Sequence, residues 1–295
     1  MKLRRALVVV KRTALSKLAK DKRVHSRRIR KLVEQRDTSV LGILEGHEEH
    51  VESVKHVKKV LKARGVDFKV QSTIPRGPVS GYDLIVPVGG DGMVLGCSHA
   101  VRDKTPVLGV NSEPSFSVGY LSGCTAETFD ETLDDLAAGT LEPLTVQRLR
   151  VSIGQRVLPE PVLNDVLFCA DNPAQMCRYR LIWPDGTELQ RSSGVWISTP
   201  AGSTSALASA GGPILPLTAK QLAFLVREPY SPPGAAVRVK SAVLVKEERL
   251  GVECLMEGAS VFLDGSHRRY RVEFGQRVWF RLGTRPLYLV RQPPG

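Results

Sequence analysis

The residues best suited to chemistry lie in segment 84–95, LIVPVGGDGMVL, where an apolar run typical of a buried strand ends at three glycines and Asp91. Gly89, Gly90 and Gly92 permit sharp turns and let a ligand approach the backbone. Open α/β sheets bind ligands at the carboxyl ends of their strands, where we expect Asp91 to lie. Backbone N–H groups beside one carboxylate suit a phosphate, together with a metal or with a hydroxyl to be deprotonated. A tight βα turn without a ligand is the alternative interpretation.

A second candidate site is segment 191–216, RSSGVWISTPAGSTSALASAGGPILP. This pattern predicts a strand that ends near residue 199, a turn, and a helix that begins near Ser203. Ser203, Thr204 and Ser205 would place hydroxyl groups at a helix N-terminus, whose free N–H groups and dipole favour phosphate. A capped helix packed closely on a sheet is the alternative.

A third element is VLNDVL, residues 162–167, in which Asn164 and Asp165 interrupt an apolar strand. Polar side chains inside such a run need partners. A bulge or turn would explain them structurally. In the functional interpretation, the amide and the carboxylate would bind ribose hydroxyls or the edge of a base.

The first part of the chain alternates strands and helices, which predicts a doubly wound, mostly parallel α/β sheet. The predicted strands are 5–10, 39–46, 67–73, 83–88 and 106–111, and the predicted helices are 47–64, 93–101 and one from a cap at Thr125 to Gly139. After Gly139 the pattern favours antiparallel β structure, with a helical insertion near 204–210. The predicted strands of this half are 178–183, 194–199, 237–246, 259–265, 270–274 and 277–282. We therefore expect an α/β nucleotide-binding domain over 1–139 and a β-rich domain over 140–295, whose C-terminal end could pack back on the first.

Composition excludes several classes of protein. The 295 residues are 42% hydrophobic, which fits a globular protein, and no apolar run reaches the roughly 20 residues of a membrane helix. The apolar stretch near the N-terminus is too short for a signal peptide. Five cysteines without a C-x-x-C pair indicate reduced thiols, so we expect a cytoplasmic protein.

A formal charge of +12 attracts polyanions such as nucleic acid, membrane surfaces or nucleotide phosphates. The densest basic cluster, residues 11–36, has few aromatic side chains for stacking on bases, which disfavours nucleic-acid binding. Two interpretations of this cluster stay open: a solvated basic helix, and a segment that helps to bind anionic substrates. His47, His50 and His56 share a predicted helix with several glutamates. We expect these side chains to form a solvated polar face of the helix. Zinc binding is the alternative interpretation.

The order and spacing of VGGDG, GVN, LND and STPAGSTSALASAGGP resemble those of the NAD kinase family. The resemblance covers about residues 7–289, and NDVLFCADNPA, RSSGVWIS and LVREPYSPPG resemble the plant-type NADH kinase branch. It implies the NAD kinase/diacylglycerol kinase-like fold, with a Rossmann-like domain and a mostly antiparallel β domain. It also implies that ATP phosphorylates the 2′-hydroxyl of the adenosine ribose of NAD or NADH, giving NADP(H).

Carried over position by position, the resemblance makes Asp91 the general base on that hydroxyl, with Gly90 and Gly92 shaping the loop beside it. It assigns a further set of residues to binding of the dinucleotide. These are Asn164, Asp165, Arg191, Ser193, Thr204, Ser205, Ser209 and, at a late turn, Asp264. Mg²⁺, or another divalent cation, would arrive with ATP and need few protein ligands, so no metal-ligating residues are assigned. The implied partners are ATP and NAD(H), without nucleic acid or membrane, and the implied assembly is a homodimer or homotetramer.

Several positions depart from the family pattern. Met93 replaces a threonine, Ser193–Gly194 stands where bacterial members have Asp-Gly, and Ala206 replaces a tyrosine. The loop 111–121, NSEPSFSVGYL, is longer than the usual Asn-x-Gly-x-Leu-Gly form. These changes leave the preference for NAD or NADH open. The sequence as a whole also leaves open whether ATP or polyphosphate is the donor, the size of the oligomer and allosteric regulation.

Two other functions compete with this interpretation. A lipid or diacylglycerol-type kinase would share the GGDG core, but the Pro-x-Gly-Thr-x-Asn-Asp element of such enzymes is missing. A basic nucleic-acid-binding protein would explain the charge and predicts steeply salt-dependent binding to polynucleotides. It gives no role to the GGDG and GST segments.

Overall fold

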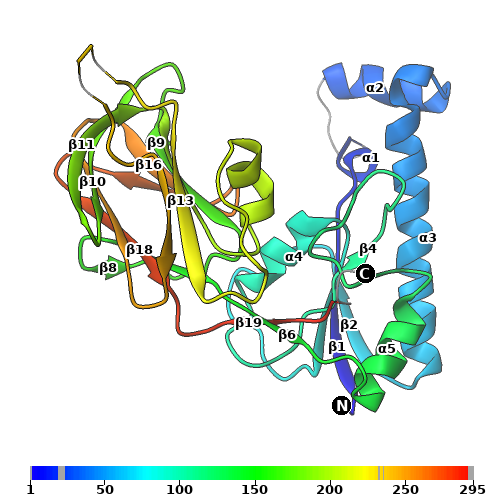
Figure 1. Cartoon of the computed structure of the whole chain (residues 1–295). Helices are drawn as coiled ribbons and strands as arrows, with labels where there is room; N and C mark the ends of the chain where they lie inside the picture. The colour runs from blue at the N-terminus through cyan, green and yellow to red at the C-terminus, as the bar shows by residue number, and fades with distance from the viewer. Residues whose placement is uncertain (1, 19–23, 232, 235, 292–295) are drawn as a thin grey trace. The chain divides into compact units, whose positions relative to one another are not determined.

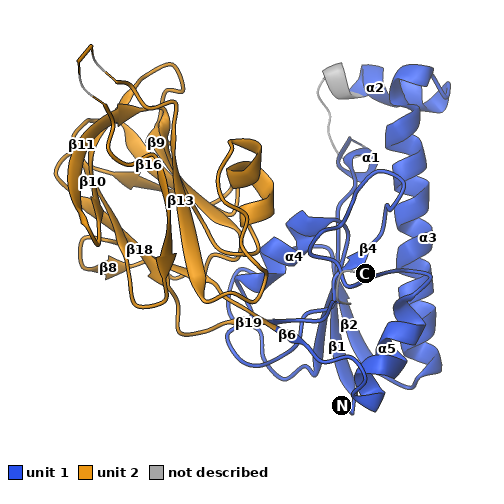
Figure 2. Ribbon diagram, in the orientation of Figure 1, with its two compact units in different colours: residues 1–144, 288–295 blue, residues 145–287 orange. Residues whose placement is uncertain are grey.

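The computed structural model describes residues 2–18, 24–231, 233–234 and 236–291, and the chain divides into two compact units (Figure 2). Unit 1 comprises residues 1–144 and 288–295, and unit 2 comprises residues 145–287. The chain passes between the units within two short paired strands, β6 (Leu144–Val146) and β19 (Leu287–Leu289).

Unit 1 is built on a parallel sheet. Its strands are β1 (Arg5–Val10), β2 (Asp67–Gln71), β3 (Leu84–Val88), β4 (Val110–Asn111) and β5 (Cys124–Thr125). They are ordered β2-β1-β3-β4-β5, and all of the neighbouring pairs run parallel. Every residue of β3 is buried, as expected of a central strand covered on both faces. Because the strands are parallel, the segments that follow β1, β3 and β4 meet at one edge of the sheet.

Helices cover both faces of this sheet (Figure 1). The helices of this unit are α1 (Ala14–Leu18), α2 (Val24–Glu34), the 3-10 turn η1 (Thr38–Val40), α3 (Leu41–Ala63), α4 (Asp91–Ser98) and α5 (Phe129–Ala138), of which α2 lies at the end of α3 and away from the sheet. Val57 and Leu61 of α3 join Phe129 and Leu133 of α5 in one buried core with the sheet. Gly139 ends α5 with φ +80°, as predicted, whereas Thr125 lies in β5 and α5 begins after Thr128. The doubly wound α/β architecture predicted for the first half is confirmed.

The predicted strand over 39–46 is wrong. These residues form the end of η1 and the first turns of α3, which has 23 residues. The Asp37 side chain accepts the Ser39 N–H at 2.9 Å and so caps this start. Val40 and Leu44 continue the spacing of the apolar face predicted for 47–64. The helical pattern therefore extends back through this segment, and residues 41–46 join the long helix instead of forming a strand.

Unit 2 contains two antiparallel sheets. Its strands are β7 (Leu149–Ile153), β8 (Arg156–Val157), β9 (Asp165–Ala170), β10 (Cys177–Trp183), β11 (Gly186–Ser192), β12 (Gly194–Ser198), β13 (Gln221–Arg227), β14 (Ser241–Val245), β15 (Leu250–Cys254), β16 (Ala259–Leu263), β17 (Arg269–Val272) and β18 (Arg277–Leu282). One sheet has the order β11-β10-β15-β18-β7-β8 and the other β14-β13-β12-β9-β16-β17. Between them lies a core in which Phe168 and Tyr179 meet edge to face, with centroids 5.7 Å apart. The single turn η2 (Ser203–Leu207) follows β12 and is the predicted helical insertion. The β-rich second half is thus confirmed.

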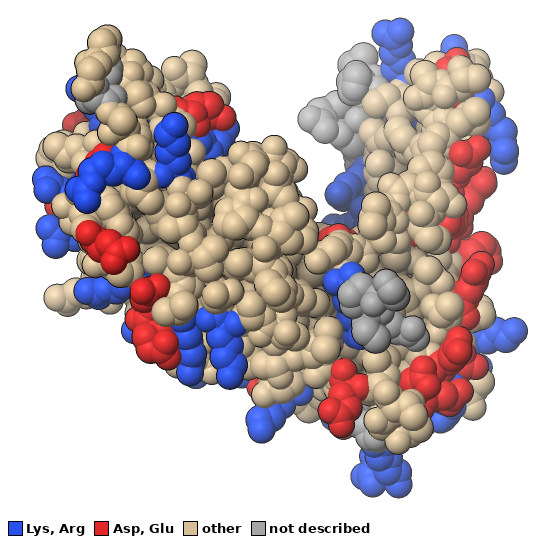
Figure 3. Space-filling view, in the orientation of Figure 1, with Lys and Arg blue, Asp and Glu red and all other residues tan. Residues whose placement is uncertain are grey.

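Charge is unevenly distributed over the surface. Acidic side chains gather over α3 and α5, although the chain as a whole is basic (Figure 3). Among the helices that the structure describes, none combines the length and the apolar character needed to cross a membrane.

Candidate active site

The GGDG turn joins β3 to α4 at the carboxyl edge of the parallel sheet. Gly89 has no room for a side chain, since a Cβ there would lie 2.5 Å from Met93 Cγ and 2.9 Å from Lys11 Cβ. A Cβ on Gly90 would lie 3.3 Å from Ser117 Oγ, whereas one on the exposed Gly92 would meet no atom within 4 Å. Close packing therefore fixes the start of the turn, and its outer part stays accessible to a ligand.

Asp91 is the first residue of α4, and its carboxylate is held by the loop that follows β4. Oδ2 accepts the Tyr120 N–H at 3.0 Å, and Oδ1 accepts the Leu121 N–H at 2.7 Å. Each carboxylate oxygen has a second lone-pair direction. The group is therefore oriented by the protein and can still accept a proton or hydrogen bond from a hydroxyl group.

Beside the GGDG turn lies a polar group that we call the Lys11 cluster: Lys11, His50, Ser112 and Glu113. The Lys11 ammonium donates to both carboxylate oxygens of Glu113, at 2.9 and 2.8 Å. His50 Nδ1 lies 2.7 Å from Ser112 Oγ and 3.9 Å from Glu113 Oε1. This cluster ties the segments after β1 and β4 to α3, next to the loop that holds Asp91.

His50 corrects the expectation of a solvated histidine face. It is only 4% exposed, and its burial lowers the pKa of the imidazole. His47 also has an internal partner, because its Nδ1 lies 2.8 Å from Thr13 Oγ1. Sequence reasoning missed Lys11 and Glu113 as well. The signal that could have found them is their position within two residues of the ends of two parallel strands, β1 and β4, which places charges at the ligand-binding edge.

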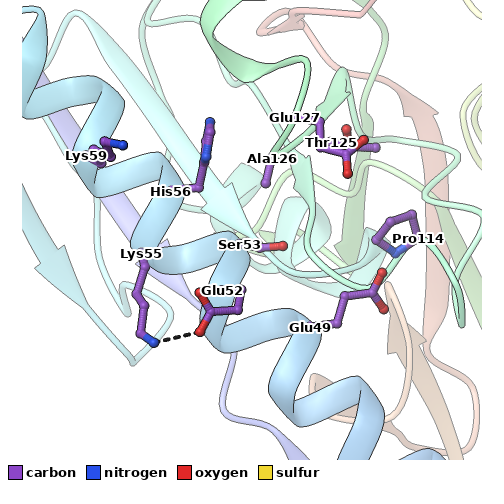
Figure 4. Close-up of a pocket in the computed structure, with 10 residues that line it drawn as sticks. All are labelled: Glu49, Glu52, Ser53, Lys55, His56, Lys59, Pro114, Thr125, Ala126 and Glu127. Atoms are coloured by element: carbon purple, nitrogen blue, oxygen red, sulfur yellow. Dashed lines mark hydrogen bonds and ion pairs between the residues drawn. The ribbon is translucent and has the colours of Figure 1, made fainter.

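Two hollows lie in unit 1 near this loop. One, of about 500 Å³, is lined by backbone and small side chains of the loop, including Asn111, Ser117 and Ser122. The other, of about 390 Å³, lies between α3 and the segments around Pro114 and Ala126 (Figure 4). Three glutamates and two lysines are among the residues that line it, and Lys55 donates to Glu52 at 2.6 Å. This mixture of charges does not indicate a ligand of one sign.

In unit 2, Asp264 organises the segment that contains Asn164 and Asp165. Its carboxylate accepts three backbone N–H groups: Leu163 at 2.9 Å, Asn164 at 2.7 Å and Asp165 at 3.1 Å. Asp264 itself has φ +48°, and its own N–H donates to the Asp165 carbonyl at 2.9 Å. These reciprocal bonds fix the start of β9 against the turn after β16.

The side chains of Asn164, Asp165 and Ser205 converge in the same place. Asn164 Nδ2 donates to Ser205 Oγ at 3.1 Å and lies 3.3 Å from Asp165 Oδ2, which is 3.2 Å from Ser205 Oγ. Burial and the neighbouring Asp264 charge raise the pKa of Asp165 to about 7. The cluster thus presents an amide, a hydroxyl and a carboxyl group that titrates near neutral pH.

The turn η2 packs closely against the Asn164 segment, and this packing positions the hydroxyl group of Ser205. A Cβ on Gly202 would lie 2.2 Å from the Asn164 carbonyl oxygen, so only glycine fits there. Ser203 is buried and bonds to the Pro200 carbonyl at 2.7 Å, which makes it structural. Thr204 is half-buried and Ser209 is exposed, and neither hydroxyl has a hydrogen-bond partner among the described residues.

Arg191 and Ser193 are not brought to this cluster. They flank the junction of β11 and β12, whereas Ser198 at the other end of β12 pairs with Asp165. Ser193 N–H donates to the Arg227 carbonyl at 3.0 Å, and Arg191 is exposed. Their assignment to dinucleotide binding stays a prediction.

In the part of the chain that the structure describes, no three His, Cys, Asp or Glu side chains lie close enough together to hold a metal ion. Single carboxylates such as Asp91 fit the chemistry of Mg²⁺, which prefers oxygen ligands and retains water. The donor set therefore fits a cation that enters with a triphosphate.

Comparison with known proteins agrees with this architecture. Residues 22–141 match the model of the ATP-NAD kinase N-terminal domain, and residues 163–292 match that of the C-terminal domain. The chain is 32% identical over 251 residues to a probable NADH kinase of Oryza sativa subsp. japonica, covering 78% of this chain and 77% of the relative. It is 31% identical over 252 residues to an NADH kinase of Arabidopsis thaliana, covering 78% and 79%.

Two solved structures share the fold. An NAD kinase from Archaeoglobus fulgidus in complex with ATP superposes with a TM-score of 0.68 at 21% identity, covering 97% of this chain and 93% of the other. A yeast NADH kinase complexed with NADH gives 0.72 at 15% identity, covering 99% and 85%. Together with the extent of sequence identity, these matches show that the chain belongs to the ATP-NAD kinase family.

Proposed function

We propose that this protein transfers the γ-phosphoryl group of ATP to the 2′-hydroxyl of the adenosine ribose of NAD(H), giving NADP(H). The observation that carries the proposal is the Asp91 carboxylate, which lies at the carboxyl end of β3 and is oriented by the Tyr120 and Leu121 N–H groups. Membership of the family and the likeness to kinases of NAD and NADH support the same reaction. The alternatives, a lipid kinase and a nucleic-acid-binding protein, find no support among the relatives.

Asp91 acts as general base in this proposal. The ribose hydroxyl donates to a free lone pair of the carboxylate, and its proton moves to Asp91 as the oxygen attacks the γ-phosphorus. The bond from the γ-phosphorus to the β–γ bridging oxygen breaks, and ADP leaves with that oxygen. Such general base catalysis typically contributes about 10²–10⁴-fold to rate. Most of the remaining catalysis of phosphoryl transfer comes from in-line positioning and neutralised charge. The open Gly92 leaves backbone accessible for that positioning, and Gly90 shapes the same loop.

The dinucleotide is bound by the cluster in unit 2. Asn164, Asp165 and Ser205 offer donors and acceptors of the kind that ribose hydroxyls and base edges need, and Asp264 fixes their backbone. Thr204 and Ser209 carry hydroxyl groups without partners among the described residues and are proposed as further contacts, with Arg191 and Ser193. We assign nucleotide binding to the domain over 1–139 and dinucleotide binding to the domain over 140–295.

The substrate is proposed to be ATP complexed with Mg²⁺ or another divalent cation, which neutralises charge on the triphosphate oxygens. We further propose a cytoplasmic homodimer or homotetramer. All five cysteines are free, which agrees with a reducing compartment. Burial raises the pKa of Cys97 to about 12, which keeps that thiol protonated.

Purified protein incubated with ATP and Mg²⁺ tests the proposal directly. NADP⁺ should form from NAD⁺, or NADPH from NADH, and the ratio of the two kcat/KM values measures the acceptor preference. Omission of the divalent cation should abolish turnover. Labelled phosphate that appears in lipid, or no product with either dinucleotide, would contradict the proposal.

A further inference from the structure

Three arginines lie in one row on the outer face of a sheet in unit 2. Along β18 the buried Val278, Phe280 and Leu282 alternate with outward-facing residues, among them Trp279 and Arg281. Arg281 is directly opposite Arg150 of β7 in the strand register. Arg249 continues the row, because it precedes Leu250, the partner of Phe280.

Like charges directly opposite each other destabilise a sheet unless something neutralises them. Within the described part of the chain, no acidic side chain forms an ion pair with any of the three arginines. The neighbouring Arg277 differs, since it pairs with Glu253 at 3.3 Å. The row therefore carries a concentrated positive charge that the protein itself leaves unbalanced.

The row borders a shaped hollow. A pocket of about 260 Å³ is lined by the three arginines together with Ser152, Gly154, Val157 and Trp279. The indole of Trp279 lies on Gly251, where a Cβ would come within 2.6 Å of the ring. Arg249 stacks on the indole with its Cζ 4.0 Å from the ring centroid. Trp279, packed on Gly251, thus holds the Arg249 side chain in place in the lining of the pocket.

From this arrangement we infer that Arg150, Arg249 and Arg281 form a binding site for a small, multiply charged phosphate anion, separate from the Asp91 and Asp264 sites. Guanidinium groups bind phosphate oxygens through paired hydrogen bonds. Neighbouring strands are about 4.8 Å apart, so adjacent arginines can contact successive phosphoryl groups of one chain. Ser152 adds a hydroxyl donor to the lining of the pocket. The inference is independent of the kinase reaction.

The indole N–H signal of Trp279 provides a local readout in the full chain. The protein has three tryptophans, so a ¹⁵N-labelled sample gives few indole N–H signals. The signal that disappears in Trp279→Phe is that of Trp279. Inorganic triphosphate, added at constant ionic strength with a chelator present, should shift this signal saturably. The triphosphate concentration that gives half of the maximal shift is the midpoint of the titration. Arg281→Gln and Arg150→Gln should each raise this midpoint at least about tenfold.

Arg277→Gln is the matched control, because it removes an arginine from the same face of the same strand but one already paired with Glu253. It should change the midpoint by less than about twofold. ADP is compared with triphosphate, and a response to both supports recognition of phosphate groups. A response to ADP alone, no shift of Trp279 with triphosphate, or equal midpoints in folded Arg281→Gln and wild-type protein would overturn the inference. Binding of oligodeoxythymidylate without a triphosphate response would equally contradict it.

Discussion

At the scale of single residues, two aspartates in unit 2 differ in role because their partners differ. Asp264 receives three backbone N–H groups, from Leu163, Asn164 and Asp165. Asp165 is buried beside that charge, which raises its pKa to about 7. One carboxylate therefore holds the backbone, and the other is free to exchange a proton or hydrogen bond with a ligand.

Asp165→Asn should flatten the dependence of stability on pH. The pKa of Asp165 rises from about 3.8 in the unfolded chain to about 7 in the folded protein, so between these values the folded state binds more protons. The free energy of unfolding therefore falls as pH rises from 4 to 7, and the loss is complete above the folded pKa. Urea unfolding at pH 5 and pH 8 should show a smaller decrease for Asp165→Asn than for wild type. An unchanged decrease would contradict the assignment.

Asp264→Asn should act mainly on dinucleotide binding. An amide oxygen can replace only part of the acceptor capacity that three N–H groups now use, so the Asn164–Asp165 segment loses its fixed position. We expect KM for NAD(H) to rise about tenfold or more, with a smaller change in kcat. Steady-state kinetics with varied NAD(H) check this split. An unchanged KM would remove Asp264 from the binding site.

At the scale of elements, the sequence predicted the position of Asp91 at the carboxyl edge of the parallel sheet. It did not predict the side chains that other segments bring to this edge. The run LIVPV followed by GGDG was enough to place Asp91 at the end of a strand, because burial and glycine geometry act locally. The ion pair of Lys11 with Glu113 joins residues 102 positions apart and leaves no local pattern. His50 was misassigned for the same reason, since its burial depends on Ser112 and not on its own helix. The strand predicted over 39–46 failed because a short apolar run cannot distinguish a strand from a turn of helix.

Glu113→Gln should loosen the loop that holds Asp91. The substitution removes the charge that pairs with Lys11, so the segment 111–121 loses its tie to the segment after β1. Hydrogen exchange at the Tyr120 and Leu121 amides should become about tenfold faster or more, and kcat should fall with it. The matched control is Glu52→Gln on α3, where an exposed glutamate pairs with Lys55. Unchanged exchange at residues 120 and 121 would contradict the role of Glu113.

Gly202→Ala should destabilise unit 2 through steric overlap. An added Cβ would lie 2.2 Å from the Asn164 carbonyl oxygen and 2.7 Å from Ser198 Oγ. We expect a loss of about 1–3 kcal/mol in the free energy of unfolding, together with weaker binding of NAD(H). Gly77→Ala is the control, because a Cβ there meets no atom within 4 Å. Equal stabilities of the two variants in urea titrations would show that the turn tolerates the extra atom.

At the scale of the whole molecule, the two units carry complementary parts of one proposed reaction. Unit 1 contains the proposed base, Asp91, at the edge of a parallel sheet, and unit 2 contains the hydrogen-bonding cluster at the start of β9 and in η2. The fold class of each half followed from periodicity alone, since strand–helix alternation and strict strand alternation are different patterns. The basic net charge did not identify a partner, and acidic residues gather over α3 and α5 (Figure 3).

The kinetics of Asp91→Asn test the central claim most directly. Asparagine preserves the shape of the side chain but cannot accept the proton of the ribose hydroxyl. With ATP, Mg²⁺ and NAD(H), formation of NADP(H) should slow by about 10²–10⁴-fold, which corresponds to roughly 3–5 kcal/mol in the barrier, while the Kd for NAD(H) changes little. Near wild-type turnover in Asp91→Asn would contradict the role of Asp91 as the general base.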